Sequence, residues 1–327
     1  MAVASARERR PGDPWPYRGK PERMNVLVTG ISGYVGSRLA VRLAHDGHAV
    51  RGLSRRPRQD VAGATVLTGD AVSGDGLPAA LEGVDVAYFL IHSMERSPDG
   101  PFSAREHQAA ENFARAAAHA GVGRIIYLGG LIPAGGPASA HLSSRLAVEE
   151  ILLRSSPCSV AFRASVVIGA GSRSFRFLVR LVERLPVLAV PAWRTHRTSP
   201  IDERDMIELL ARAATNNEVC GQTFDVGGPD VVSYGELIDR IANLMLVNRP
   251  TISLGRLTVT PIASRVASVI AGEDWELVGP LMESLDDDLL PRDDRAADVL
   301  GVRRHSLDAA IEHALGEWES NEPLAAR

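Results

Sequence analysis

The chain has 327 residues, of which 45% are hydrophobic, and a formal net charge of -4 at pH 7. This length and composition are typical of a globular protein with one large core or two unequal ones, and the weakly acidic balance argues against nucleic acid as a partner. No apolar run reaches the roughly 18 residues that a membrane-spanning helix needs. We therefore expect a soluble, cytoplasmic protein with no nucleic-acid partner and no membrane span.

The first 23 residues contain a charged run and a proline-rich stretch, and they lack the apolar core of a secretory signal. We interpret residues 1–23 as a loose N-terminal tail, and the sequence leaves open whether translation starts at Met1 or Met24. The two cysteines, Cys158 and Cys220, lie far apart in a chain without a secretory signal, so the sequence favours reduced thiols over a disulfide.

The first predicted strand runs directly into a glycine-rich loop. The apolar residues before Thr29 are followed by glycines at positions 30, 33 and 36 and then by a helix-like stretch. Such a loop lets the pyrophosphate of a dinucleotide approach bare backbone N–H groups at the N-terminus of a helix. We expect this loop to bind the cofactor through Thr29, Gly30, Ser32, Gly33, Tyr34, Val35 and Gly36.

Ser54, Arg55 and Arg56 follow the second predicted strand, residues 48–53. NAD-binding proteins usually place an acidic residue here, which accepts hydrogen bonds from the ribose 2′-hydroxyl. A hydroxyl and two guanidinium groups would instead bind a 2′-phosphate, so the pattern favours NADP(H) over NAD(H). The alternative is an ordinary surface turn, because arginines are common in a chain whose only lysine is Lys20.

Two more strand ends carry polar residues. Asp70 follows the third predicted strand, residues 64–68, where it would either meet the adenine or cap a turn. The fourth predicted strand, residues 84–91, ends in Ile91, His92 and Ser93. These would lie near the nicotinamide ribose in the usual strand order, or they form an ordinary polar strand end.

The rest of the first half continues the alternation of strands and helices. We predict helices over residues 103–119 and 141–153 and strands over residues 124–128 and 159–163. Ser103 is the expected cap of the first of these helices, and Gly121 its end. This order predicts an α/β fold with a doubly wound parallel sheet, the Rossmann fold, which binds ligands at the carboxyl ends of its strands.

The pattern becomes less regular beyond residue 165, with predicted helices over residues 174–185 and 203–214 and a strand over residues 223–226. We expect a dinucleotide-binding domain over residues 24–165 and a smaller substrate-side region over residues 166–327. Phe175 and Phe177 would line a pocket or belong to the core. Asp286–Asp288 is expected to be a solvated loop, and no metal site is expected.

Several of these motifs together resemble the extended and atypical short-chain dehydrogenase/reductases, and within them the bacterial NAD(P)H-binding, NmrA-like group. The resemblance covers most of the chain after Met24 and implies a Rossmann fold with a nicotinamide cofactor. It is carried by the glycine loop, Gly69–Asp70, Tyr88–Ser93, Tyr127–Gly130, His141–Arg145, Arg163–Gly169 and Phe224–Pro229.

The sequence departs from that superfamily at the catalytic positions. The superfamily uses a Tyr-x-x-x-Lys pair after the fifth strand, but His141 and Arg145 occupy this spacing, and Gly129–Gly130 replace the hydroxyl-bearing residue. Because the only lysine is Lys20, a tyrosinate mechanism of that type is excluded.

Residues four apart share a helix face, so His141 and Arg145 are candidates for a substitute catalytic pair. With an ordinary pKa near 6.5, His141 would act as a general acid, while Arg145 would hydrogen-bond the nicotinamide ribose. The alternative is that His141 merely begins a polar helix and Arg145 lies on its solvated face.

Two functions fit these observations. The first is an NADP(H)-dependent oxidoreductase that passes hydride to a quinone-like or unsaturated acceptor, which needs a placed acid less than an ordinary carbonyl does. The second, which the resemblance implies, is a non-catalytic protein that binds NADP(H) to sense redox state or to stabilise a complex. The sequence leaves open whether the protein is an enzyme, and whether its partner is an unknown small-molecule substrate or another protein.

Overall fold

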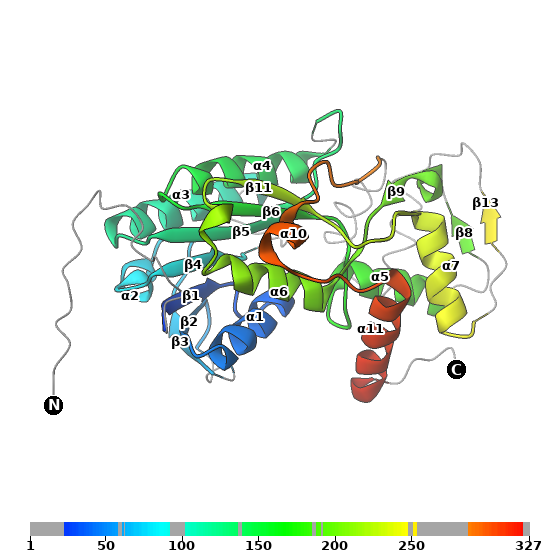
Figure 1. Cartoon of the computed structure of the whole chain (residues 1–327), viewed down its shortest axis with the longest axis horizontal. Coiled ribbons are helices and arrows are strands. Elements are labelled where there is room, and N and C mark those ends of the chain that lie inside the picture. The colour runs from blue at the N-terminus through cyan, green and yellow to red at the C-terminus, as the bar shows by residue number, and fades with distance from the viewer. Residues whose placement is uncertain are drawn as a thin grey trace.

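The computed structural model describes residues 23–57, 61, 63–91, 102–136, 139–184, 188–190, 192–247, 251–253 and 287–322. Helices cover both faces of a central sheet, and further helices from the C-terminal part of the chain lie beyond one end of it (Figure 1). None of the helices within these ranges combines the length and the apolar character that a membrane span requires.

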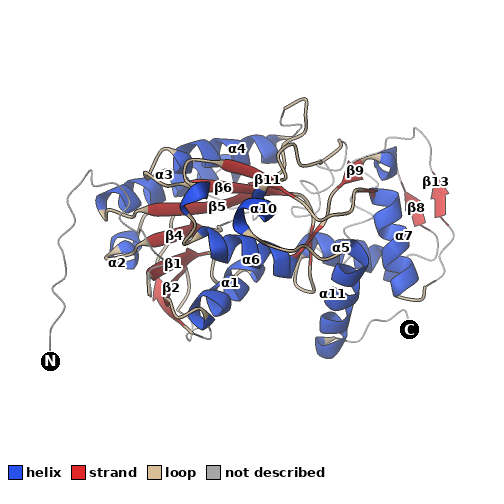
Figure 2. Ribbon diagram, in the orientation of Figure 1, coloured by secondary structure: helices blue, strands red, loops and turns tan. Residues whose placement is uncertain are grey.

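The central sheet has seven strands, and every neighbouring pair is parallel (Figure 2). Its spatial order is β11 (Thr223–Val226), β6 (Val160–Ala164), β5 (Arg124–Gly130), β4 (Val86–Phe89), β1 (Asn25–Thr29), β2 (Ala49–Ser54) and β3 (Ala64–Thr68). The strand order reverses at β1, which lies between β2 and β4. In an open parallel sheet, the crevice at such a reversal is where ligands bind. The expected doubly wound Rossmann fold is therefore confirmed.

Side chains alternate between the two faces of the sheet because successive residues of a strand point in opposite directions. Val26 and Val28 pack with α1 (Tyr34–His45) and α6 (Glu203–Ala213), while Leu27 packs with α2 (Leu77–Leu81) and α3 (Phe102–His119). Two other helices, α4 (Ala140–Leu153) and α10 (Ala296–Leu300), extend these two layers. Burial on both faces explains why the strands read as nearly continuous apolar runs.

A second core lies beyond the sheet. It is built around α5 (Arg173–Arg184), α7 (Tyr234–Leu244) and α11 (Leu307–Asn321), with Phe175 and Trp318 among its most buried side chains. The remaining strands are short and pair with one another outside the central sheet. They are β7 (Val167–Ile168), β8 (Leu188–Val190), β9 (Arg197–Thr198), β10 (Ile201–Asp202), β12 (Val232–Ser233) and β13 (Thr251–Ser253), with 3-10 helices at Ala192–Thr195 and Asn217–Val219.

Chain order does not separate the two cores. After contributing α5 to the second core, the chain returns to the sheet, where α6 and α10 pack against one face and β11 forms an outer strand. The expected boundary at residue 165 therefore marks where the chain first leaves the sheet, while residues 201–226 and 296–302 contribute to the sheet's core.

Most predicted elements lie within one or two residues of the observed ones, and β3 and β11 match to the residue. Ser103 is not the cap of α3 as expected, because the helix already begins at Phe102 and Ser103 falls in its first turn. Gly121 has a positive φ of 70° just after α3, as expected of a glycine that ends a helix.

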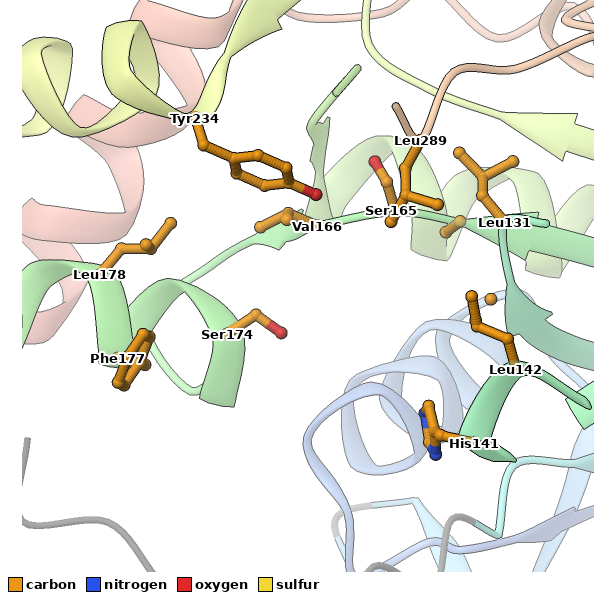
Figure 3. Close-up of a pocket in the computed structure, with 12 residues that line it drawn as sticks. Leu131, His141, Leu142, Ser165, Val166, Ser174, Phe177, Leu178, Tyr234 and Leu289 are labelled. Carbon is orange, nitrogen blue, oxygen red and sulfur yellow. The ribbon is translucent and has the colours of Figure 1, made fainter. Parts of the chain in front are cut away.

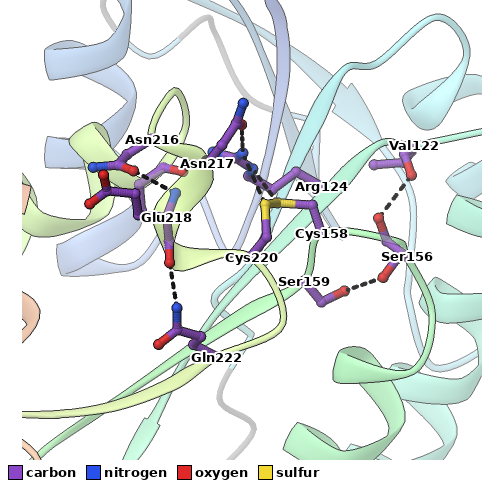
Figure 4. Close-up of a disulfide and its surroundings, with 11 residues drawn as sticks. Val122, Arg124, Ser156, Cys158, Ser159, Asn216, Asn217, Glu218, Cys220 and Gln222 are labelled. Atoms are coloured by element: carbon purple, nitrogen blue, oxygen red, sulfur yellow. Dashed lines mark hydrogen bonds between the residues drawn. A yellow bond between two sulfur atoms is a disulfide. The ribbon is translucent and has the colours of Figure 1, made fainter. Parts of the chain in front are cut away.

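The expectation of two reduced thiols is wrong, because Cys158 and Cys220 form a disulfide (Figure 4). Cys158 precedes β6 and Cys220 precedes β11, and the pairing of these strands brings the two cysteines to a Cα–Cα distance of 4.4 Å across 62 residues of sequence. Arg124 lies beside the disulfide, with its Nε 3.1 Å from the Cys158 sulfur and its Nη2 3.5 Å from the Cys220 sulfur. The sequence could not reveal the pairing because it depends on which strands become neighbours.

Candidate functional site

The glycine loop connects β1 to α1 in a tight turn. Gly30 has a φ of +69°, and a Cβ there would lie 2.5 Å from the carbonyl oxygen of Leu90 at the end of β4. A Cβ at Gly36 would collide with the carbonyl oxygen of Gly30. Both glycines are therefore required by the packing of the loop, since a side chain at Gly30 would collide with the backbone after β4 and one at Gly36 would push α1 away from the loop.

Gly33 has a different environment from the other two glycines. It is exposed and is the N-cap of α1, and its N–H donates a 2.8 Å hydrogen bond to the Gly30 carbonyl. A Cβ there would approach only the Gly30 oxygen, at 3.1 Å. The outer side of the loop thus presents bare backbone at the start of a twelve-residue helix with no acidic residue in its first turn, which fits a pyrophosphate.

Not every predicted loop residue turns its side chain to this open side. Thr29 is fully buried; its hydroxyl donates to the Tyr88 carbonyl at 2.9 Å and accepts from the Leu90 N–H at 3.2 Å, which ties β1 to β4. Val35 packs against the sheet's core, and Ser32 is exposed.

The Tyr34 ring lies on the other side of the loop. Added Cβ atoms at Gly169 and Gly171 would collide with Tyr34, and the Arg38 guanidinium lies 4.8 Å from the ring centroid. The tyrosine side chain therefore packs on the segment that follows β7, and its backbone is the part of the residue that faces the glycine loop.

The carboxyl ends of β2 and β3 carry the other predicted cofactor residues. Ser54 is buried and its hydroxyl accepts a 3.4 Å hydrogen bond from the Arg56 N–H, while Arg55 and Arg56 are exposed. Asp70 accepts a 2.8 Å hydrogen bond from the Val72 N–H, so it has the turn-capping contact that was the alternative to an adenine contact. Ile91 is half-buried just after β4, and His92 and Ser93 lie outside the described residues.

Arg145 does not lie on a solvated face of α4. Its side chain is 7% exposed, and its Nε lies 3.7 Å from the Glu106 carboxylate of α3. Ser144 donates a 2.8 Å hydrogen bond to the other carboxylate oxygen of Glu106. Burial raises the pKa of Glu106, against the lowering effects of Arg145 and Ser144. The pair fixes the guanidinium in a buried position one helical turn from His141.

His141 begins α4 after the Ser139 cap, whose hydroxyl accepts a 3.2 Å hydrogen bond from the Leu142 N–H. Burial, and secondly the charge of Arg145, lower the pKa of His141 to about 3. The ring is therefore neutral at pH 7 and does not provide the imidazolium acid that an ordinary pKa would allow. A neutral imidazole still donates one hydrogen bond and accepts another.

A pocket opens beside His141 at the carboxyl ends of β5 and β6 (Figure 3). Its described lining is mostly apolar and comes from both cores. The lining residues are Gly130, Leu131, His141, Leu142, Ala164, Ser165, Val166, Ser174, Phe177, Leu178, Tyr234 and Leu289.

Sequence reasoning missed Tyr234, Ser165 and Ser174 as pocket residues. The Ser165 hydroxyl donates a 3.0 Å hydrogen bond to the Ser199 carbonyl, and Tyr234 is the first residue of α7. The signal available was a capping box, in which Ser233 and Glu236 bond each other's backbone N–H groups and mark the start of a helix. Nothing local showed that the first residue of this helix would line the pocket.

The two roles expected of Phe175 and Phe177, packing in the core and lining a pocket, are both observed. Phe175 is fully buried in the second core, and Phe177 belongs to that core while also lining the pocket.

One group of side chains in the described part of the chain could hold a metal ion. Glu203, His313 and Glu317 place one ligand atom each within 4.8 Å of one another. Arg38 already pairs with Glu203 at 3.1 Å and also with Glu317, so a cationic side chain lies among these carboxylates. In the predicted acidic loop, Asp286 lies outside the described residues, and Asp288 pairs with Arg197 at 2.8 Å.

The chain is similar in sequence and fold to several known proteins. The model of the NmrA-like family matches residues 22–214. A (4-alkanoyl-5-oxo-2,5-dihydrofuran-3-yl)methyl phosphate reductase from Streptomyces griseus is 29% identical over 223 residues, which cover 67% of this chain and 73% of that protein. Subunit 9 of the mitochondrial NADH dehydrogenase (ubiquinone) 1 alpha subcomplex from Arabidopsis thaliana is 26% identical over 225 residues, covering 65% of this chain but only 56% of the plant protein.

Among solved structures, the Bordetella bronchiseptica enzyme WbmH in complex with NAD+ superposes with a TM-score of 0.67 at 18% identity, over 92% of this chain and 99% of that one. This likeness concerns the fold. Because the family model covers more than half of the sequence, the chain belongs to the NmrA-like family.

Proposed function

We propose that the protein is an NADP(H)-dependent oxidoreductase that reduces a quinone-like or unsaturated acceptor. The observation that carries this proposal is the apolar pocket, which starts at His141 and Gly130, at the carboxyl edge of the sheet where the glycine loop also lies. An intact cofactor loop and a pocket for a second molecule at the same edge are what a hydride transfer requires.

The loop and its neighbours would hold the dinucleotide. The backbone at the start of α1, beside the exposed Ser32 and Gly33, would bind the pyrophosphate, and the exposed Arg55 and Arg56 with Ser54 would bind the ribose 2′-phosphate of NADP(H). Asp70 and Ile91, together with His92 and Ser93, remain proposed contacts of the adenosine and nicotinamide ends. When bound, the reduced nicotinamide supplies a hydride.

The chain's own residues favour acceptors that need no strong acid. His141, held neutral at pH 7, would orient the acceptor through a hydrogen bond, and Arg145, fixed by Glu106, would hold the nicotinamide ribose. A quinone or a conjugated double bond yields an anion stabilised by delocalisation, which water protonates. An ordinary carbonyl yields an alkoxide, which depends more on a placed acid.

The name of one relative supports the same class of reaction. The Streptomyces griseus relative is named as a reductase whose substrate contains a dihydrofuran ring with an oxo and an alkanoyl group. This chain shares a large part of its length with that protein, and a reductase of an unsaturated ring is the class of activity we propose here.

A non-catalytic role is the second candidate. The match to a named subunit of a mitochondrial NADH dehydrogenase favours a protein that binds the dinucleotide to sense redox state or to stabilise a complex. This role needs cofactor binding and no turnover, so His141 would have no catalytic function.

We also propose a cytoplasmic location. The disulfide between Cys158 and Cys220 would then meet cellular reductants, so its state in the cell is a direct test. Alkylation of free thiols in rapidly quenched cells, followed by mass spectrometry, would find mainly reduced protein. A uniformly oxidised population would instead favour an oxidising compartment.

The proposed function is tested by titrating protein that starts at Met24 with NADPH and NADH in parallel, following nicotinamide fluorescence, and then adding 1,4-naphthoquinone. We expect tighter binding of NADPH and its oxidation after the quinone is added. Tight binding without oxidation of NADPH by any of a panel of quinones and conjugated enones would favour the non-catalytic role. Failure to bind either nucleotide would overturn the proposal.

A further inference from the structure

The polar groups of the pocket lie on two separate walls. His141 belongs to the wall formed by the end of β5 and the start of α4. This wall lies at the carboxyl edge of the sheet, where the glycine loop also lies. Tyr234 and Ser174 come from α7 and α5 of the second core. Figure 3 shows the Tyr234 hydroxyl pointing into the pocket from the side opposite His141. Aliphatic side chains, among them Leu131 and Val166, line the space between.

None of the twelve described residues that line the pocket carries a charge at neutral pH, because His141 is held neutral. A phosphate or carboxylate on the acceptor would lose its hydration here without meeting a cationic side chain from this lining, which is costly. The described walls therefore suit a neutral molecule, unlike the phosphate ester named for the Streptomyces griseus relative.

The Tyr234 side chain is held in place by its surroundings. Its exposed fraction is 1%, and its ring packs in the second core. Its backbone N–H donates a 3.0 Å hydrogen bond to the His196 carbonyl, directly after the capping box that starts α7. A rigid donor of this kind loses little conformational freedom when it binds a ligand.

Tyr234 keeps its proton at neutral pH. Burial raises the pKa of this phenol to about 12, partly opposed by the neighbouring Thr198 hydroxyl. A phenol accepts a hydrogen bond through its oxygen and donates one through its O–H at the same time. Contact with Thr198 is thus compatible with donation to a molecule in the pocket.

We propose that the pocket binds a neutral, largely apolar acceptor with an oxygen at each end, and that Tyr234 donates a hydrogen bond to the oxygen remote from His141. A para-quinone has this shape, whereas a monocarbonyl compound does not. This inference rests on the proposed function, because that function places the end of the acceptor that receives the hydride at His141. It adds the substrate class and a residue that selects it.

The reaction balances with the components named. The quinone gains a hydride from the nicotinamide and a proton from water, and it becomes the hydroquinone while NADPH becomes NADP+. Tyr234 keeps its own proton throughout and acts by binding the remote oxygen. Its removal should therefore weaken binding and raise KM more than it lowers kcat.

The test measures binding without the cofactor, so that it does not depend on turnover. Calorimetry would compare 1,4-naphthoquinone with 1-tetralone, which has a similar fused-ring skeleton and a single oxygen. We expect the wild-type protein to bind the quinone about tenfold more tightly, and the Tyr234→Phe variant to lose about three- to tenfold for the quinone and nothing for the tetralone, as for one hydrogen bond.

A matched control is Tyr88→Phe, which removes the same atom from another buried tyrosine. The Tyr88 hydroxyl donates to the Leu210 carbonyl at 2.9 Å, within the sheet's core, so this variant should lose stability and keep both affinities. Equal binding of the two compounds by the wild-type protein would overturn the inference, even if Tyr234→Phe failed to fold. Quinone binding that depends on Tyr234 but is never followed by NADPH oxidation would uphold this pocket chemistry and count against the proposed function alone.

Discussion

The two cores of the protein use different parts of their residues for binding. At the sheet, the candidate cofactor site is made largely of backbone, since Gly30 and Gly36 allow the tight turn and Gly33 leaves the helix N-terminus bare. In the second core, the candidate acceptor site is made of side chains, with Phe177 and Tyr234 presented by α5 and α7. Substitutions in the glycine loop should therefore change cofactor binding, and substitutions of Phe177 or Tyr234 should change acceptor binding.

The largest expected effect is a loss of stability that leaves ligand binding unchanged. Replacing Cys158 and Cys220 by serine removes a cross-link across 62 residues, which costs about 4 kcal/mol of unfolding free energy in the chain-entropy model. The cysteines precede β6 and β11, so they lie at the amino ends of the strands, away from the carboxyl edge. Urea unfolding should show the loss, while the Kd for NADPH stays within twofold. A large change in that Kd would mean that the two edges of the sheet are coupled.

A pair of glycine variants sharpens the role of the backbone. Gly36→Ala should cost about 1–3 kcal/mol of stability, because its Cβ collides with the Gly30 carbonyl and the loop must shift. It should also weaken NADPH binding. Gly33→Ala serves as its control, because its Cβ meets only the Gly30 oxygen at 3.1 Å, so it should fold normally and still bind NADPH at least about tenfold more weakly. Normal NADPH binding by Gly33→Ala would place the pyrophosphate elsewhere.

The proposed preference for NADPH over NADH would depend on two exposed arginines. Replacing both Arg55 and Arg56 by serine should raise the Kd for NADPH about tenfold, since hydrogen bonds to a charged phosphate are lost, and leave the Kd for NADH unchanged. Arg115→Ser, at an exposed site on α3, controls for the change in overall charge. Equal weakening for both nucleotides would show that the arginines do not read the 2′-phosphate.

The smallest expected effect concerns His141, which lies where the two cores meet. Its pKa is about 3 in the folded protein and near 6.5 when unfolded, so the unfolded state binds more protons between these values and stability falls as the pH falls. Between pH 6.5 and 5.5 this contributes a loss of about 1 kcal/mol, which His141→Gln should remove. An NMR titration of the His141 ring with a midpoint near 6.5 would contradict the neutral histidine and restore the general acid.

The first half of the fold could be predicted because its information is local. Apolar runs such as Val86–Phe89 mark buried strands, and the glycine spacing marks a tight turn between a strand and a helix. His141 and Arg145 were identifiable as a pair because four residues make one helical turn. The burial of Arg145 was not, because it depends on Glu106 from another helix.

The same reason explains what was missed in the second half. The disulfide and Tyr234 acquire their positions when segments far apart in the chain become neighbours. The capping box at Ser233 predicts where α7 starts but not which surface it will face.

The late return of β11 to the sheet has a consequence for how the protein is made. Until residues 223–226 have been synthesised, β6 is the outermost strand and shows a row of unsatisfied backbone groups on its open side. Strands in that state readily pair with other chains, so the nascent polypeptide is most prone to aggregate during this interval. A fragment that ends at residue 165 would keep this open edge permanently, and a shortened version meant for study must extend at least through Val226.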